Sequence, residues 1–198
     1  QTEFEALELP RASARDLRRR FAQGVDRCDA AGRRRQDAAV RQAWSDLLAA
    51  ASRVRAYALS RLEQRASDEV AGLREAAESA VAGLAQAPKV ARDLLAQQLE
   101  GADSGAIGCD LAANEAALRL LCVRAELLAD LPTPEEDLEL RREYQMRRLV
   151  ESMGRGERTS AAGFDDLTLE WLAVGPLAPA VPHALLERFK RWPTSHSS

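Results

Sequence analysis

The chain contains few of the residues on which most enzyme and metal chemistry depends. Only 2 of its 198 residues are histidine and 3 are cysteine. Cys28, Cys109 and Cys122 are isolated, with no C-x-x-C pair, so the sequence predicts neither a disulfide framework nor a zinc site. Cys122 lies on an apolar helical stripe and is predicted to be a core residue. Because acid–base and zinc chemistries lack their usual side chains, we predict a protein that is not an enzyme and holds no metal or cofactor.

Long hydrophobic runs are absent too. No stretch approaches the roughly 20 consecutive apolar residues needed to cross a bilayer, and no signal peptide opens the chain. Isolated cysteines are typical of a reducing compartment. These absences predict no membrane partner and a cytoplasmic location. Because the chain starts at Gln1 rather than at methionine, the sequence leaves open whether it is a piece of a longer tandem protein.

Aromatic residues make up only 5% of the chain, and alanine supplies much of its 46% hydrophobic content. A composition rich in alanine, arginine and glutamate, with few β-branched residues, favours helices throughout. A chain of this length can bury a full core. We predict an all-α fold, a multi-helix bundle of antiparallel amphipathic helical hairpins that forms a single domain over residues 1–198.

Periodic apolar positions, and the glycines and prolines between them, divide this domain into three parts. Residues 13–64 are predicted to form a helical hairpin that turns at Gly32. Residues 67–130 are predicted to form an acidic helical middle, and residues 134–192 the C-terminal helices.

The stretch from Leu111 to Met153 contains the clearest signals. Its apolar residues recur at three- and four-residue spacing up to Pro132, where the proline ends the helix. Thr133 is predicted to cap the next helix, with Pro134 at its first position and Glu136 completing a capping box. The short connection predicts an antiparallel helical hairpin.

Part of this stretch is similar to a known family. The run LCVRAELLADLPTPEED from Leu121 to Asp137, followed by LRREYQMRRL from Leu140 to Leu149, resembles a segment near the end of bacterial proteins in domain-of-unknown-function family 349. Those proteins are long and helix-rich, and they have no established catalytic residues. The resemblance therefore implies a helical bacterial protein and implies nothing about its activity.

Charge is distributed unevenly along the chain, although the net charge is only −3. Residues 1–65 carry 14 basic and 9 acidic side chains, residues 66–139 carry 5 and 15, and residues 140–198 carry 9 and 7. The simpler interpretation of the arginines is a set of solvated helix faces. The alternative is binding of RNA or DNA, because arginine-rich helix surfaces can contact phosphates. The candidate residues are Arg33, Arg34, Arg35, Arg141, Arg142, Arg147 and Arg148.

The function that the sequence favours is a non-catalytic helical scaffold or interaction module. Its hairpins are expected to pack on one another and on a partner, which is either another protein or a second copy of the chain. Such a module exposes an apolar surface beyond what its own core uses. The candidate interface residues are Phe164, Trp171 and Trp192.

Overall fold

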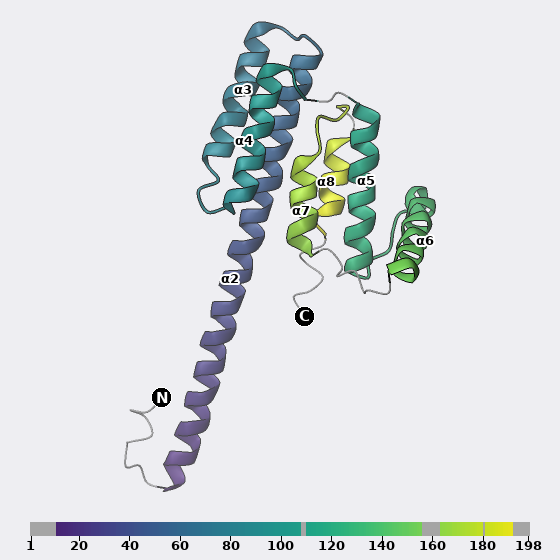
Figure 1. Ribbon diagram of the computed structural model, residues 1–198. Coiled ribbons are helices and arrows are strands. Elements are labelled where there is room, and N and C mark those ends of the chain that lie inside the picture. The colour runs from purple at the N-terminus through teal and green to yellow at the C-terminus, as the bar shows by residue number, and fades with distance from the viewer. Residues whose placement is uncertain (1–10, 108–109, 156–162, 180, 192–198) are drawn as a thin grey trace. The chain divides into compact units, whose positions relative to one another are not determined.

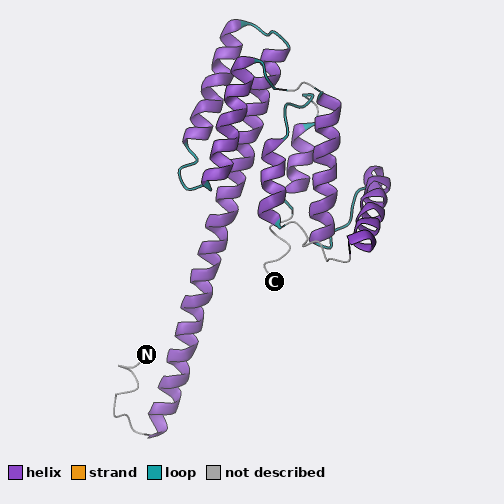
Figure 2. Ribbon diagram, in the orientation of Figure 1, coloured by secondary structure: helices purple, strands orange, loops and turns teal. Residues whose placement is uncertain are grey.

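The computed structural model describes residues 11–107, 110–155, 163–179 and 181–191. All regular structure within these ranges is helical, and none of the described residues forms a strand (Figure 2). The predicted all-α multi-helix fold is therefore confirmed. No described helix is both long enough and apolar enough to cross a membrane.

The α-helices can be followed along the chain in Figure 1. The elements are α2 Arg11–Leu62, α3 Ser67–Ala82, α4 Lys89–Ser104, α5 Leu111–Leu128, the 3₁₀ helix η1 Glu135–Asp137, α6 Leu138–Arg155, α7 Phe164–Ala173 and α8 Pro182–Phe189. Local chemistry fixes some of their ends. Asp110 caps α5 by accepting from the amide of Ala113 at 2.9 Å, and Gly105 ends α4 in the left-handed conformation with a φ of 73°.

α2 is one continuous helix, so the predicted hairpin over residues 13–64 is wrong. The predicted turn residue, Gly32, lies inside the helix. A glycine in a helix interior costs only about 1 kcal/mol relative to alanine. Alanines and arginines, which are good helix formers, surround this one, and no proline is near enough to break the backbone hydrogen bonds.

The contacts within the chain divide it into two units, residues 1–42 and residues 43–198. The described part of the first unit is the N-terminal portion of α2. None of its described side chains is buried, and Leu17, Phe21 and Val25, spaced four residues apart, are each more than a third exposed. The described residues of this unit therefore form no core of their own.

The second unit is built around the C-terminal portion of α2. Residues 47–58 of this helix contribute to three clusters of buried side chains. The first cluster joins Leu48 to α5, α7 and α8, the second joins Leu47 to α4 and α7, and the third joins Val54 and Tyr57 to α3 and α4. Figure 1 shows these helices side by side. Burial of apolar surface against one helix therefore holds the unit together.

A carboxylate near the end of α4 links three helices. Asp103 accepts hydrogen bonds from Tyr57 of α2 and from Arg74 of α3, the latter at 3.1 and 2.9 Å. The hydrogen bonds from Arg74 and then from Tyr57 hold the pKa of Asp103 below its usual value. Burial, and then the hydrogen bond to Asp103, raises the pKa of Tyr57. The ionised carboxylate is therefore the form that the fold stabilises.

The connection between α5 and η1 lacks the predicted capping box. Pro134 is the N-cap of η1, and no side chain caps that end. The hydroxyl of Thr133 instead donates to Glu126 and accepts from Arg141, both at 2.7 Å. Hydrogen bonds to charged groups are stronger than those to a backbone amide, which explains why the Thr133 hydroxyl bonds to these side chains and does not cap the helix. The antiparallel direction of the predicted hairpins stays a prediction.

Candidate functional site

α6 is held against the rest of the second unit along one side only. Its half-buried residues are Leu140, Arg141 and Tyr144. Arg141 donates to the carbonyl oxygen of Leu131 at 2.9 Å and to the hydroxyl of Thr133. Every other described side chain of α6 is exposed. The contact is therefore confined to the first half of the helix.

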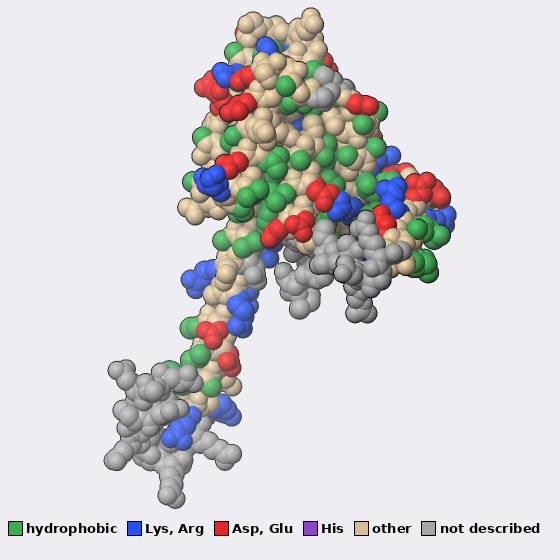
Figure 3. Space-filling model, in the orientation of Figure 1, with side chains coloured by type: hydrophobic (Ala, Val, Ile, Leu, Met, Phe, Trp, Pro, Cys, Tyr) green, Lys and Arg blue, Asp and Glu red, His purple; other side chains and the backbone are tan. Residues whose placement is uncertain are grey.

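Part of the exposed surface of α6 is apolar. Val150 is 64% exposed and Met153 is 76% exposed. Figure 3 shows hydrophobic side chains at the surface of this helix, with charged side chains beside them. Contiguous exposed apolar side chains mark binding surfaces. We call this surface the α6 apolar face, and its residues are Leu138, Met146, Leu149, Val150 and Met153.

The arginines of α6 that were predicted to bind nucleic acid differ in their surroundings. Arg141 is half-buried and bonded to the α5–η1 connection, and exposed Arg142 forms an ion pair with Glu139 at 3.3 Å. Arg147 and Arg148 are exposed, and neither forms an ion pair with another described residue. Only these two are therefore available to a partner, and they lie beside the α6 apolar face.

The other predicted basic group, Arg33, Arg34 and Arg35, lies on α2, and all three side chains are exposed. Consecutive residues of a helix point about 100° apart, so three in a row cannot form one flat patch. They belong to the first unit, whereas the arginines of α6 belong to the second, so each group is described within its own unit.

The predicted interface residue Trp171 is not at the surface, so this prediction is wrong. Its side chain is 1% exposed and stacks on Phe189, with the ring centroids 4.3 Å apart. An indole ring buries a large apolar area, and the core formed by α5, α7 and α8 uses it. Trp192 and the side chain of Phe164 lie outside the described residues.

A buried ionic cluster, which the sequence did not predict, ties α8 to α5 and η1. Arg188 donates to both carboxylate oxygens of Glu126, at 2.5 and 2.9 Å, and to Asp137. All three side chains are at most 10% exposed. Arg119 places a second cation 3.7 Å from Asp137. The signal in the sequence was Glu126, which comes four residues after Cys122 on an apolar stripe where a carboxylate needs a buried partner.

This cluster lies beside the one buried cysteine among the described residues. Burial by itself lowers the pKa of Arg188, but its hydrogen bonds with Glu126 and Asp137 outweigh burial and raise the pKa overall. Burial raises the pKa of the Cys122 thiol to about 12. A thiol with that pKa is not a nucleophile at neutral pH. Cys122 is 1% exposed, which confirms its predicted place in the core.

A second buried cation, Arg55, lies on the core side of α2. Its Nε donates to the carbonyl oxygen of Val174 at 3.0 Å, and a terminal nitrogen donates to the carbonyl oxygen of Trp171. The guanidinium carbon lies 5.7 Å from the centroid of the Trp171 ring. Burial lowers the pKa of Arg55 to about 10. The sequence contained a signal here too, because Arg55 comes seven residues after Leu48 and four after Ala51 on the apolar stripe.

No group of three or more His, Cys, Asp or Glu side chains that could hold a metal ion occurs in the described part of the chain. Comparison with known proteins gives no further assignment: no family model, no curated protein and no solved structure matches the chain. A function therefore has to be inferred from the surfaces and cavities of the protein itself.

Proposed function

We propose that this chain is a non-catalytic helical interaction module that binds a protein partner through the α6 apolar face. The observation that carries the proposal is the exposure of Met146, Leu149, Val150 and Met153 on a helix that contacts its unit only through its first half. The resemblance of this region to domain-of-unknown-function family 349 is part of the proposal. It supports a helical module and adds no activity.

Hydrophobic burial supplies the driving force for such a complex. Moving one large apolar side chain fully out of water is favourable by about 1.5–3 kcal/mol, before the costs of association. Amphipathic helices bind partners by placing their apolar side against a groove or a second helix. The hydrogen bonds of Arg141 hold the first half of α6, so its apolar side is presented without a large change in the rest of the unit.

The charges beside the face indicate the chemistry of the partner. Residues 145–153 carry two arginines and one glutamate. Arg147 and Arg148 have no ion pair with any described residue. A helix that carries acidic side chains beside apolar ones complements both features. The partner we propose is therefore an acidic amphipathic helix of another polypeptide.

A photo-crosslinking amino acid at position Val150, introduced in the native cells, tests this proposal. We expect a covalent product with one defined polypeptide from Val150, and none from Glu75, which is exposed on α3. The captured polypeptide is then purified and titrated against the chain. The double substitution Val150→Glu and Met153→Glu is expected to weaken its binding by about tenfold or more.

Three outcomes would overturn the proposal: equal crosslinking from Val150 and Glu75, unchanged affinity of the double variant, or a product that contains two copies of this chain. The last identifies self-association, which analytical ultracentrifugation of the purified chain measures directly. Both substituted side chains of the double variant are exposed, so its melting temperature is expected to match that of the wild type.

Nucleic-acid binding is the second candidate, and the composition of the first unit favours it. Residues 11–42 carry ten arginines, four aspartates and neither glutamate nor lysine. An exposed arginine-rich helix supplies phosphate contacts without further chemistry. Titration of fluorescent RNA and duplex DNA tests this candidate, with an expected salt slope of about −0.9 per duplex phosphate contacted.

Substitution of arginine by glutamate tests which arginines bind nucleic acid. Replacing Arg33, Arg34 and Arg35 by glutamate is expected to remove nucleic-acid binding, whereas replacing Arg147 and Arg148 is expected to leave it unchanged. Absence of binding at low salt rules the candidate out.

A further inference from the structure

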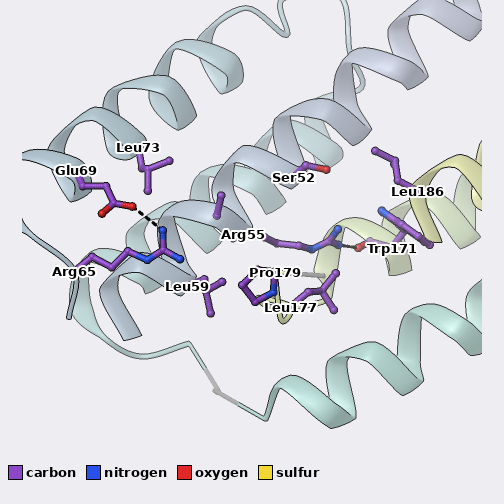
Figure 4. A pocket seen from close by; sticks show the side chains of 11 residues that line it. Ser52, Arg55, Leu59, Arg65, Glu69, Leu73, Trp171, Leu177, Pro179 and Leu186 are labelled. Carbon is purple, nitrogen blue, oxygen red and sulfur yellow. Dashed lines mark hydrogen bonds and ion pairs between the residues drawn. The ribbon is translucent and has the colours of Figure 1, made fainter. Parts of the chain in front are cut away.

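A cavity of about 280 Å³ lies in the second unit beside α2 (Figure 4). Its walls come from α2, from α3 and the turn before it, and from α7, α8 and the segment between them. Pockets that hold small organic molecules range upward from about 300 Å³. The cavity lies just below the lower end of that range, so its volume suits only a compact ligand.

One wall of the cavity carries a buried positive charge. Arg55 is 6% exposed, and it donates to the carbonyl oxygens of Val174 and Trp171. No described carboxylate forms an ion pair with it. Two of the five N–H groups of the guanidinium serve these carbonyls. Because carbonyl dipoles compensate a buried charge less well than an anion does, this wall suits an incoming anion.

A second donor without an acceptor lies in the same wall. The indole Nε1 of Trp171 is buried and has no hydrogen-bond partner among the described residues. Figure 4 shows this nitrogen on the edge of the ring turned toward Arg55 and Leu186. The large majority of buried side-chain polar atoms in proteins have a partner. An unsatisfied indole N–H beside an unpaired guanidinium indicates a place for a negatively charged acceptor.

The rest of the cavity selects against highly charged ligands. Leu59, Leu73, Leu177 and Leu186 make much of its lining apolar. The other lining cation, Arg65, is already paired with Glu63 and Glu69 at 2.6 Å each. Glu69 itself lines the cavity and repels a second negative charge. A ligand that fits these walls has one anionic head and a compact apolar body.

We propose that this cavity binds a small organic acid, whose carboxylate contacts Arg55 and Trp171 and whose apolar body lies among the leucines. The ligand class is a medium-chain or aromatic monocarboxylic acid. This site is separate from the α6 apolar face, and its occupancy does not depend on the proposed protein partner.

Octanoate is the probe for this site, and 1-octanol is its uncharged counterpart. The chain has three tryptophans, and loss of one indole N–H resonance in Trp171→Phe identifies the signal of Trp171 in nitrogen-15 spectra. We expect octanoate to shift this resonance saturably. We expect the affinity of 1-octanol to be lower than that of octanoate by about tenfold or more. Arg55→Met is expected to weaken octanoate binding by about ten- to a hundredfold, and Arg55→Lys by less, because the charge is kept.

A variant at an exposed position keeps the test independent of the core. Ala56 lines the cavity but is exposed, so Ala56→Phe is expected to fill the cavity and abolish the octanoate shift. Ala49→Phe lies two turns earlier on the same side of α2, outside the cavity, and is expected to bind as the wild type does. The proposal is overturned if octanoate leaves the Trp171 resonance unchanged, or if 1-octanol or inorganic phosphate binds with the same affinity as octanoate. It is also overturned if the two phenylalanine variants bind octanoate equally.

Discussion

The two buried arginines differ in what surrounds them, and this difference has an energetic consequence. Arg188 is paired with Glu126 and Asp137, whereas no described carboxylate pairs with Arg55. A buried ion pair adds little net stability, but removal of one partner leaves the other charge buried and unpaired. Substitution of Arg188 should therefore lower the free energy of unfolding by more than the net stability that its ion pairs contribute.

Arg188→Met is accordingly expected to lower the free energy of unfolding by about 3–5 kcal/mol. Arg142→Met, which breaks the exposed pair of Arg142 with Glu139, is expected to change it by less than about 1 kcal/mol. Urea unfolding followed by circular dichroism measures both. Equal effects of the two substitutions would contradict the role of burial in this argument.

Asp103 determines part of the pH dependence of stability. Arg74 and Tyr57 hold its folded pKa below the unfolded value of about 3.9. The unfolded chain therefore binds the proton more tightly, so the contribution of Asp103 to stability is complete above the unfolded pKa. It is lost as the pH falls through the folded pKa.

Asp103→Asn is expected to be less stable than the wild type near neutral pH, since Arg74 and Tyr57 lose a charged acceptor. The difference between the two proteins is expected to shrink as the pH falls below about 4. Urea midpoints measured across this acid range test the prediction. A difference that stays constant with pH would show that Asp103 does not titrate in a stabilised environment.

The sequence predicted buried apolar residues better than buried charges. Leu48 and Val54 of α2 and Cys122 of α5 lie on apolar stripes, and all three are buried. The stripe formed by Leu17, Phe21 and Val25 is exposed, so spacing alone does not guarantee burial. Arg55 and Glu126 lie on such stripes too, but a charged side chain is buried only where the fold supplies hydrogen-bonding groups for it. These groups are carbonyl oxygens for Arg55 and the guanidinium of Arg188 for Glu126. The partner of Glu126 is 62 residues away in the sequence, and local spacing does not reveal it.

Two glycines inside α2 allow the stability of this helix to be changed. A Cβ atom added at Gly24 or Gly32 meets nothing within 4 Å. Replacing either glycine by alanine is therefore expected to stabilise this part of the helix by about 1 kcal/mol. Gly105→Ala is the contrasting variant, because its φ of 73° strains any side chain, and it is expected to destabilise the chain.

Helix content by circular dichroism, and urea unfolding for Gly105→Ala, measure these effects. A loss of helix content on Gly32→Ala would show that the helix does not run through this position.

The contrast between these glycines also explains why the turn at Gly32 was wrongly predicted. Gly32 and Gly105 are both glycines near charged or polar residues, but only Gly105 has the positive φ that ends a helix. That conformation depends on the path the chain takes after the glycine, which a single glycine in a sequence does not show. For α6, the periodicity predicts an amphipathic helix, but which residues the rest of the fold covers depends on tertiary contacts.

Over the whole chain, α2 belongs to both units, and its side chains are buried in only one of them. Residues 47–58 contribute side chains to all three core clusters, whereas none of the described side chains in residues 16–42 is buried. Helices without tertiary packing are marginally stable in water. We expect the amides of residues 16–36 to exchange with deuterium about a hundredfold faster than those of residues 47–58. Mass spectrometry of exchanged peptides measures this, and equal protection of the two portions would contradict it.

The fold class could be predicted because alanine, arginine and leucine favour the same structure everywhere along the chain. The boundary between the units could not, because it falls between Gln42 and Ala43, inside a helix, where no proline or glycine marks it. The cavity was also beyond prediction, since Arg55 and Trp171 are far apart in the sequence and meet only after the core forms.

The order of synthesis gives the central place of α2 a consequence for the cell. The side chains that cover Leu48 on α5, α7 and α8 are translated about 70 to 140 residues after it. At a synthesis rate of about 5–20 residues per second, the side chains that pack on Leu48 are made roughly 4 to 28 seconds after it. We therefore expect this apolar surface of the nascent chain to stay partly exposed to water until α8 has been synthesised.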